Sequence, residues 1–158
     1  MVEHIIAHDY DGKPHLVDRA DLTSRLSVRA IAILNDEVLM VTCRRHNAKL
    51  EFPGGGVNEG ESNEEALARE MREETGLEVV GEPIPVMSYQ NYYYSTREGT
   101  AWDSTIEYYT TDVDGEIAID DPDDDVVSVN WVELPLNRDD VKAEDALVLE
   151  QINPDYVQ

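Results

Sequence analysis

The sequence predicts an α/β sandwich with a mixed central sheet, not a doubly wound parallel sheet. Two observations favour this class. Segments rich in Val, Ile, Thr and Tyr surround one well-delimited helical segment, and a second helical segment comes near the end of the chain. The 158 residues suit one domain with a core of its own. We therefore expect one domain over residues 1–158, with an N-terminal extension over 1–25 and a core over 26–152.

The core begins with a predicted β-hairpin. The apolar runs 27–34 and 37–44 flank the dipeptide Asn35-Asp36. A two-residue turn between two short apolar runs is typical of a hairpin, because such a turn matches the twist of paired strands. In the N-terminal extension, Ile5-Ile6 and the turn sequence Asp11-Gly12 favour an extended strand.

A helix is predicted over residues 63–75, and its flanking sequence delimits it at both ends. Ser62 and Glu65 have the spacing of a capping box, in which each side chain satisfies the other residue's free backbone N–H. Gly76 follows the last helical position, where the end of a helix needs the left-handed conformation that glycine adopts readily. The sequence therefore fixes both ends of this helix locally.

The segments after this helix are predicted to be strands and turns, closed by a second helix. Strands are expected where Val, Ile, Thr and Tyr are frequent, over 79–94, 105–113 and 126–134. Two connections lack periodicity, namely a mobile loop over 99–104 and a solvated acidic turn over 120–125. The closing helix is expected over 139–152, with one apolar face formed by Val141, Leu147, Val148 and Ile152.

The net charge of the chain is strongly negative. Thirty-five Asp and Glu against twelve Lys and Arg give a formal charge of −23. So acidic a chain repels nucleic-acid backbones and anionic membranes, which argues against a nucleic-acid or membrane partner. The N-terminus lacks the pattern of a signal peptide, and the single cysteine, Cys43, suits a reducing compartment and is expected in the core rather than as a nucleophile. We therefore expect a cytoplasmic protein, and a homodimer stays open.

Three carboxylates gather on one face of the predicted helix. At about 100° per residue, Glu70, Glu73 and Glu74 fall within about 100° of arc, beside an apolar stripe of Leu67 and Met71 that would dock on the sheet. Carboxylates at this spacing repel one another unless hard divalent cations neutralise them, and oxygen-rich sites are those that Mg²⁺ prefers. The residues alone leave two interpretations open: a metal site, or a solvated acidic face in an acidic protein.

The segment 55–77 resembles the Nudix box, a signature of the form Gly-x5-Glu-x7-Arg-Glu-apolar-x-Glu-Glu-x-Gly-apolar. The sequence matches every defined position, with Gly55, Glu61, Arg69, Glu70, Met71, Glu73, Glu74, Gly76 and Leu77. The preceding residues 51–54, Glu-Phe-Pro-Gly, resemble the usual lead-in to the box. The resemblance covers 23 of the 158 residues. It implies a MutT-like Nudix fold, that is, an α/β/α sandwich with a mixed central sheet.

The resemblance also implies a reaction, the Mg²⁺-dependent hydrolysis of a phosphoanhydride bond in a nucleoside diphosphate linked to another moiety. The implied metal ligands are Glu70, Glu73, Glu74 and the carbonyl of Gly54, with Mn²⁺ as a substitute for Mg²⁺. The implied catalytic residues are Glu70, Glu73 and Arg69, with Glu70 as the base that activates water and Arg69 orienting the neighbouring carboxylate. Many family members use a further carboxylate after the box, for which this sequence offers Glu98, Asp103, Glu107, Glu116 and residues 123–125.

Aromatic and basic residues outside the box are candidates for substrate binding. Tyr93 and Tyr94 lie at about the offset where a subgroup that hydrolyses dinucleoside polyphosphates carries a tyrosine, which implies stacking on a base. Tyrosine is also an ordinary strand residue, so core and solvent positions stay open. Arg29, Arg44 and Arg45 on the early hairpin are candidate phosphate ligands, with surface ion pairs as the alternative. Trp102 is a candidate lid residue in the predicted loop.

The substrate itself stays open among dinucleoside polyphosphates, nucleoside triphosphates and nucleotide sugars. One alternative is a Nudix-fold sensor that binds a nucleotide without hydrolysing it. Such a protein is expected to lack one of Glu70, Glu73 or Glu74, and this chain has all three. A second alternative is an RNA-end pyrophosphatase, against which the net charge of −23 and the lack of a basic stripe argue.

Overall fold

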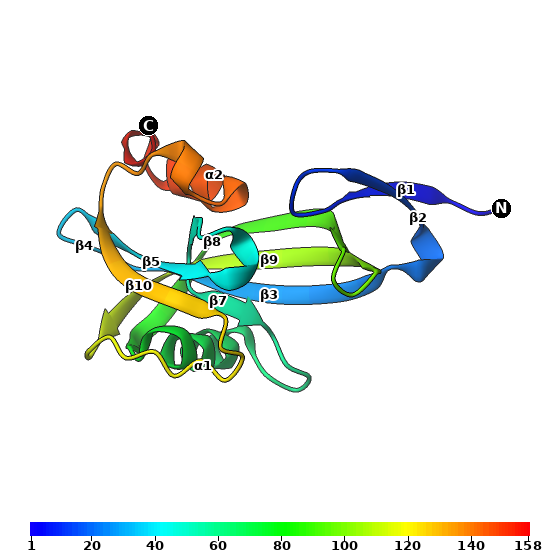
Figure 1. The fold of residues 1–158 in the computed structure, drawn as a ribbon. Helices are drawn as coiled ribbons and strands as arrows, with labels where there is room; N and C mark the ends of the chain where they lie inside the picture. Colours follow the sequence, from blue (N-terminus) through cyan, green and yellow to red (C-terminus); the bar gives the residue numbers. More distant parts are fainter.

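The computed structural model describes all of residues 1–158, and its strands lie between two α-helices (Figure 1). Neither helix has the length and apolar character needed to cross a bilayer. In chain order the elements are β1 (His4–His8), β2 (Pro14–Asp18), η1 (Arg19–Asp21), β3 (Thr23–Ile31), β4 (Ile33–Leu34), β5 (Glu37–Cys43), η2 (Arg44–His46), β6 (Leu50–Glu51), β7 (Gly54–Gly56), α1 (Asn63–Thr75), β8 (Glu78–Ser95), β9 (Thr100–Asp114), β10 (Val126–Glu133), η3 (Arg138–Asp140), α2 (Ala143–Ile152) and η4 (Pro154–Tyr156).

The strands form two sheets, and both parallel and antiparallel pairs occur. The larger sheet has six strands in the order β2-β1-β8-β9-β3-β7, and the smaller has β10-β5-β4 with β6 on the side of β5. β3 runs parallel to β9, and β1 runs parallel to β8. The chain passes from one sheet to the other at residue 32, between β3 and β4. The mixed sheet therefore confirms the predicted fold class.

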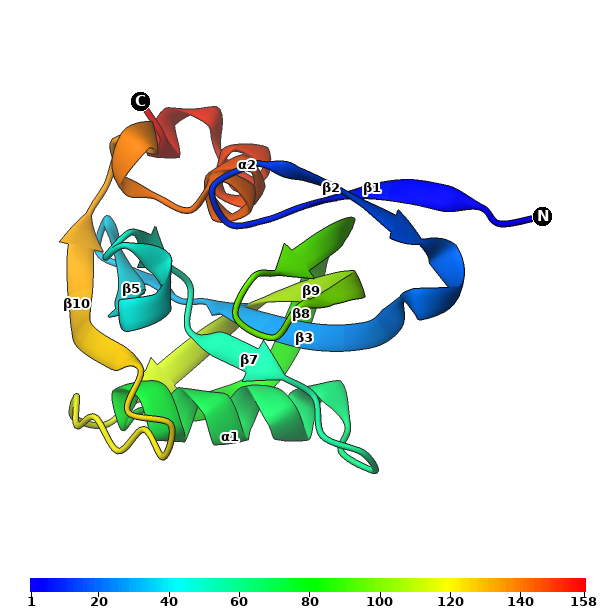
Figure 2. The same ribbon diagram turned by 45° about the vertical axis from the view of Figure 1, so that its right-hand side comes forward.

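Two apolar clusters lie on opposite faces of the strands. Successive side chains of a strand point to opposite faces. In β5, Leu39 and Val41 therefore join the cluster that contains Leu67 and Met71 of α1. Their neighbours Val38 and Met40 join the cluster that contains Ala146, Val148 and Leu149 of α2. Burial of each such side chain contributes roughly 1.5–3 kcal/mol, which makes the two clusters the main source of stability. Figure 2 shows α1 on one side of the strands and α2 on the other.

Helix α1 begins and ends where its flanking sequence predicts. The Ser62 hydroxyl accepts a hydrogen bond from the Glu65 N–H at 3.1 Å, and the Glu65 carboxylate accepts one from the Ser62 N–H at 2.9 Å. Gly76 has a φ of 77°, and a Cβ at this position would lie 2.4 Å from the carbonyl oxygen of Ala118. Glycine is therefore required both for the left-handed turn and for the close passage of the chain at Ala118.

The predicted turn at Asn35 and Asp36 is confirmed, but the hairpin is shorter than expected. Both residues have positive φ, 51° and 61°, as a two-residue hairpin turn of this kind requires. The turn joins β4 to β5 in the smaller sheet. The earlier residues of the predicted first strand belong to β3, which pairs with β9 in the larger sheet.

Two predictions for the C-terminal half were wrong. Residues 99–104 are not a loop, because β9 starts at Thr100 and pairs with the end of β8 at Ser95. This cross-strand pairing is long-range and leaves no periodicity in the local sequence. The second helix begins at Ala143 instead of residue 139, and Leu147 is 44% exposed on its outer face.

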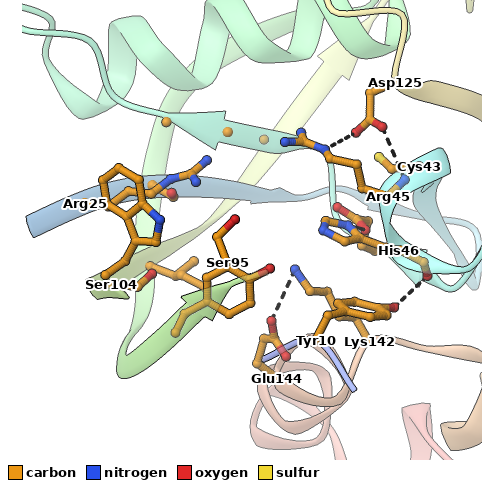
Figure 3. Close-up of a pocket in the computed structure, with 18 of the residues that line it drawn as sticks. Tyr10, Arg25, Cys43, Arg45, His46, Ser95, Ser104, Asp125, Lys142 and Glu144 are labelled. Carbon is orange, nitrogen blue, oxygen red and sulfur yellow. Dashed lines mark hydrogen bonds and ion pairs between the residues drawn. The ribbon is translucent and has the colours of Figure 1, made fainter. Parts of the chain in front are cut away.

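The N-terminal extension forms the hairpin β1–β2, which joins the larger sheet. β1 pairs with β8 through His8 and Tyr93. The turn of the hairpin reaches η2, where the Tyr10 hydroxyl donates a hydrogen bond of 2.6 Å to the carbonyl of His46 (Figure 3). The Tyr10 and His46 rings are stacked, with 5.1 Å between their centroids. The N-terminal extension is thus an integral part of the fold.

Asp145 in the first turn of α2 ties this helix to the strands. Its side chain is buried and accepts two hydrogen bonds, from the Tyr108 hydroxyl at 2.8 Å and from the Phe52 N–H at 2.9 Å. Burial raises the pKa of Asp145 to about 6, although Arg29 and Lys142 act in the opposite direction. The charged form is therefore less favourable in the folded protein than in the unfolded chain.

We expect this carboxyl to make the stability depend on pH. Because the pKa of Asp145 is higher in the folded protein, its contribution to the unfolding free energy is fully present below the unfolded-state pKa of 3.8. This contribution is lost as the pH rises through the folded-state pKa of about 6. Relative to Asp145→Asn, the unfolding free energy of the parent protein should fall by about 3 kcal/mol between about pH 4 and about pH 7. Urea unfolding of both proteins at these pH values measures the difference. A constant difference between parent and variant would contradict the assignment.

Candidate active site

A cleft of about 670 Å³ brings together residues from most parts of the chain. Its walls come from the β1–β2 hairpin, β3, the end of β5 with η2, the loop before α1, the connection β8–β9, the acidic segment after β9, and the start of α2 (Figure 3). The predicted metal ligands Gly54, Glu70 and Glu74 all line it. Glu73, the fourth predicted ligand, does not.

Glu74 and Glu70 form the acidic end of the cleft. Glu74 is 9% exposed, and its carboxylate accepts one hydrogen bond, from the Gly54 N–H at 3.3 Å. Burial raises the pKa of Glu74 well above its usual value, Arg29 opposes this, and Glu70 adds to it. Burial also raises the pKa of Glu70, against the effect of Arg69. Glu74 thus has no ion-pair partner within the protein, and the partly buried Glu70 has only Arg69. This donor set of hard oxygens fits a divalent cation.

The backbone at Gly55 makes room for Glu70. A Cβ on Gly55 would lie 2.5 Å from Glu70 Oε1 and 2.6 Å from its carboxyl carbon. Gly55→Ala must therefore displace the carboxylate. We expect kcat to fall about 10²-fold, since misplacement of a reacting group by about 1 Å costs that much.

The Gly55→Ala effect is measured as kcat under saturating Mg²⁺, with circular dichroism to verify the fold. Gly56→Ala is the matched control, because a Cβ there meets no atom within 4 Å. Equal kcat for Gly55→Ala and the parent would exclude this steric role for Gly55.

Arg69 holds three carboxylates of the helix and the loop before it. Its Nη1 donates to Glu70 at 2.8 Å and to Glu73 at 3.3 Å. Its Nε donates to Glu61 at 2.7 Å, and its Nη2 donates to the carbonyl of Gly56 at 2.9 Å. The neighbouring carboxylate, Glu70, is thus oriented through a charge-assisted hydrogen bond. Glu61 and Glu73 are engaged with Arg69 at the outer side of the helix.

Arg29 of β3 donates hydrogen bonds to the segment that carries Gly54, at the acidic end of the cleft. Its Nη1 donates to the carbonyls of Phe52 and Gly54, both at 3.2 Å, and lies 3.4 Å from Glu51 Oε1. Burial alone would raise the pKa of Glu51, but the hydrogen bond from His46 and the charge of Arg29 outweigh it and lower the pKa to about 2. Glu51 is therefore a buried, charged carboxylate between Arg29 and His46.

The other walls of the cleft carry both basic and acidic side chains. Seven acids line them, namely Asp9, Glu51, Glu98, Asp121, Asp123, Asp125 and Glu144. Half of the twelve Lys and Arg of the chain line it, namely Arg25, Arg29, Arg45, Arg97, Lys49 and Lys142. The three arginines predicted as phosphate ligands differ in position. Arg29 lines the cleft but is engaged with Glu51 and two backbone carbonyls. Arg45 lines the cleft and pairs with Asp125 at 2.8 Å. Arg44 lies outside the lining and bonds to the carbonyl of Asp124.

Only one of the two tyrosines predicted to stack on a base lines the cleft. Tyr93 lines the cleft. Tyr94 does not, and its ring is stacked on His15 with 4.0 Å between centroids. Trp102 lies in β9 opposite Tyr93, lines the cleft, and carries the guanidinium of Arg25 over its ring at 5.8 Å. The indole N–H of Trp102 is buried and has no hydrogen-bond partner in the protein.

The acidic residues after the box divide in the same way. Glu98, Asp123 and Asp125 line the cleft, whereas Asp103 bonds to Gln90 and Glu107 bonds to Ser88 on the strand surface. Sequence reasoning missed Asp121. Its carboxylate accepts hydrogen bonds from the N–H groups of residues 123, 125 and 126 and so shapes the acidic turn at the cleft. Its position two residues before the next aspartate is the signal of an Asx turn that could have identified it.

The family of the protein follows from a comparison over most of its length. Residues 23–152 match the family model described as NUDIX domain. The chain belongs to the Nudix hydrolase family. The expected membership is thereby confirmed, and the segment that matches the box carries Glu70 and Glu74 into the cleft.

Two named relatives match shorter segments of this Nudix protein. An RNA pyrophosphohydrolase of Ectopseudomonas mendocina (strain ymp) is 49% identical over 49 residues, which are 30% of this chain and 31% of the relative. An 8-oxo-dGTP diphosphatase of Escherichia coli (strain K12) is 33% identical over 79 residues, which are 46% of this chain and 60% of the relative. The matches thus span less than two thirds of either relative.

Solved structures of Nudix proteins share the fold. A MutT Nudix hydrolase from Burkholderia pseudomallei has a TM-score of 0.67 and 21% identity, covering 83% of this chain and 99% of that one. A Nudix hydrolase from Nitrosomonas europaea has a TM-score of 0.65 and 20% identity, covering 84% of this chain and 90% of that one. At these identities the likeness is one of fold.

Proposed function

We propose that this Nudix protein is a cytoplasmic pyrophosphohydrolase that cleaves a phosphoanhydride bond in a nucleoside diphosphate linked to another moiety. One observation carries the proposal. The buried carboxylate of Glu74 and the partly buried carboxylate of Glu70 lie at one end of a cleft whose other walls hold half of the chain's Lys and Arg. An acidic surface repels a polyphosphate, so a binding site for one must concentrate positive charge. The cleft gathers six of the twelve Lys and Arg, but seven acids share the same walls. A divalent cation held by Glu70 and Glu74 would therefore supply the further positive charge that a polyphosphate needs.

The acidic end would hold Mg²⁺, for which Mn²⁺ can substitute. Glu70, Glu74 and the carbonyl of Gly54 are the ligands within the cleft, with Glu73 at its outer edge. The bound cation supplies positive charge that stabilises the phosphate oxygens in the transition state. The Gly54 carbonyl lines the cleft and accepts a hydrogen bond of 3.2 Å from the Arg29 side chain.

The chain's own residues then position the attacking water. Arg69 fixes Glu70 through the hydrogen bond at 2.8 Å to Oε1, which leaves Oε2 to accept a proton from water. Arg29 fixes the loop that carries Gly54. Glu70 therefore acts as the base, and Arg69 and Arg29 are positioning residues.

Basic and aromatic residues that line the cleft would bind the rest of the substrate. Arg25, Arg45 and Lys142 face a phosphate chain, and Tyr93 with Trp102 offers a surface for a base. Dinucleoside polyphosphates, nucleoside triphosphates and nucleotide sugars all have both parts. The relative named as 8-oxo-dGTP diphosphatase favours a nucleoside triphosphate in this group.

Hydrolysis of a 5′-triphosphate end of RNA is the second candidate, supported by the relative named as an RNA pyrophosphohydrolase. The net charge of −23 opposes it, because an RNA chain beyond its first nucleotides would meet an acidic surface.

The proposal is tested by incubating the protein with Mg²⁺ and a panel of a dinucleoside tetraphosphate, nucleoside triphosphates, nucleotide sugars and 5′-triphosphate RNA. Product analysis by chromatography and a phosphate assay identifies the bond that breaks. We expect a mononucleotide product from a small nucleotide and little turnover of RNA. If the protein binds these compounds but hydrolyses none of them, the sensor alternative is favoured and the enzyme proposal is overturned.

Arg44 and Arg45 provide a matched pair of variants that tests whether the cleft binds the substrate phosphates. Arg45→Ala is expected to raise KM about 10-fold, since a charge-assisted phosphate contact contributes roughly 1.5–3 kcal/mol before losses to solvent and to Asp125. Arg44→Ala should leave KM unchanged, because Arg44 lies outside the cleft. Steady-state kinetics on the best substrate of the panel compares the two. Equal KM values for both variants would exclude Arg45 from the phosphate site.

A further inference from the structure

A second cluster of possible metal ligands lines the same cleft and includes none of the carboxylates of α1. It consists of Cys43 at the end of β5, His46 in η2 and Glu51 on β6. The ligand atoms of these three residues lie within 4.8 Å of one another. A thiol, an imidazole and a carboxylate are the three side chains that bind Zn²⁺ in proteins. None of the three belongs to the box that supplies Glu70 and Glu74.

The local fold explains how the three residues meet. β5 and β6 are antiparallel neighbours with Val41 opposite Glu51, and η2 lies in the connection between them. Cys43 therefore leaves one strand, His46 stands in the turn, and Glu51 lies on the returning strand. Asn47 follows with a left-handed φ of 51°, which reverses the chain directly after His46. The sequence Cys-x2-His-x4-Glu places three ligands within nine residues.

The cluster is already close to what a tetrahedral ion needs. With Zn–S near 2.3 Å and Zn–N and Zn–O near 2.1 Å, ligand atoms are separated by roughly 3.3–3.6 Å. His46 Nδ1 and Glu51 Oε2 are now 2.5 Å apart and share a hydrogen bond. A metal would replace that proton and move the two atoms apart by roughly 1 Å. The other oxygen, Oε1, faces Arg29 at 3.4 Å and can keep this partner, which would fix the ligating carboxylate in place.

The charge and burial of the cluster suit a divalent ion. Cys43 and Glu51 are 4% and 1% exposed. A thiolate and a carboxylate together neutralise the charge of the ion, which makes its burial possible next to Arg29. All three residues line the cleft, so three protein ligands would leave a fourth position open towards it.

We propose that Cys43, His46 and Glu51 form a binding site for a thiophilic divalent ion such as Zn²⁺, separate from the Mg²⁺ site proposed at Glu70 and Glu74. Binding releases the thiol proton of Cys43 and the proton shared by His46 and Glu51. The open position takes a water or an anionic oxygen of a ligand in the cleft. Mg²⁺, which prefers oxygen ligands, does not compete for a site with a thiolate.

Titration of the full-length, metal-free protein with Co²⁺ in excess Mg²⁺ tests the proposal. Cys43 is the single cysteine of the chain, so any thiolate-to-cobalt charge-transfer absorption reports on this residue. We expect one equivalent of Co²⁺ per chain, displacement by Zn²⁺, and protection of Cys43 from alkylation. Cys43→Ser should abolish the absorption, and His46→Ala should weaken Co²⁺ binding at least about 10-fold, as loss of one ligand or its support does.

Glu74→Gln is the matched control, because it alters the other metal site and should leave the cobalt spectrum unchanged. His46 is partly exposed, so His46→Ala tests the site even if Cys43→Ser fails to fold. Absence of the absorption, or binding that His46→Ala leaves as tight as in the parent, would overturn the proposal. One Co²⁺ per two chains would also overturn it, since the ion would then bridge two copies of Cys43.

Discussion

Glu74→Gln is expected to lower kcat about 10³-fold, since removal of a metal ligand forfeits several kcal/mol of transition-state stabilisation. Glu74 is 9% exposed and accepts one hydrogen bond in the structure, from Gly54. The amide of glutamine fills the same space without a negative charge, so the fold is retained while the divalent cation loses a ligand. Steady-state kinetics at saturating Mg²⁺, together with a Mg²⁺ titration, measures the loss.

The stability of the Glu74→Gln variant separates this explanation from simple unfolding. A neutral amide costs less to bury than an unpaired carboxylate. The metal-free variant should therefore unfold at a temperature no lower than the metal-free parent. Glu64→Gln, on the exposed side of the same helix, is the control and should keep full activity. Retention of more than a tenth of kcat in Glu74→Gln would sink the assignment of Glu74 as a metal ligand.

Arg29→Met is expected to destabilise the protein by about 3–5 kcal/mol, because it leaves a buried carboxylate without its partner. The side chains of Arg29 and Glu51 are 12% and 2% exposed. The same guanidinium donates to the carbonyls of Phe52 and Gly54, which also lose a donor. Urea unfolding at neutral pH measures the free energy of unfolding.

Two further variants distinguish the buried pair from a general need for arginine on β3. Arg25→Met removes an exposed arginine from the same strand and should cost less than about 1 kcal/mol. In the double variant Arg29→Met with Glu51→Gln, the second change should restore at least about 1 kcal/mol, since the uncompensated charge is gone. Additive losses in the double variant would show that Arg29 and Glu51 are not coupled.

The local features of the site could be predicted from the sequence, because they depend on neighbours in the chain. The capping box of Ser62 and Glu65 predicted the start of α1 and Gly76 its end, and helical periodicity predicted which carboxylates share a face. The position of Glu73 outside the cleft could not be read from periodicity, which places it on the same helix face as Glu70 and Glu74.

The parts that could not be predicted depend on contacts between distant segments. Arg44 and Arg45 are adjacent in the sequence and both belong to η2, but only Arg45 lines the cleft. Trp102 lies in a strand because β9 pairs with β8, and Arg29 is held by a carboxylate 22 residues later. No local pattern records such pairings, which is why the substrate wall was harder to predict than the carboxylate helix.

The hairpin β1–β2 precedes residue 23, where the match to the family begins, yet His8, Asp9 and Tyr10 line the cleft. The groups proposed to react therefore lie in one segment of the chain, and part of the cleft surface comes from another. Selection can alter the hairpin without touching Glu70 or Glu74, so the choice of substrate and the chemistry can evolve separately. Relatives that share the box need not share the compounds they accept.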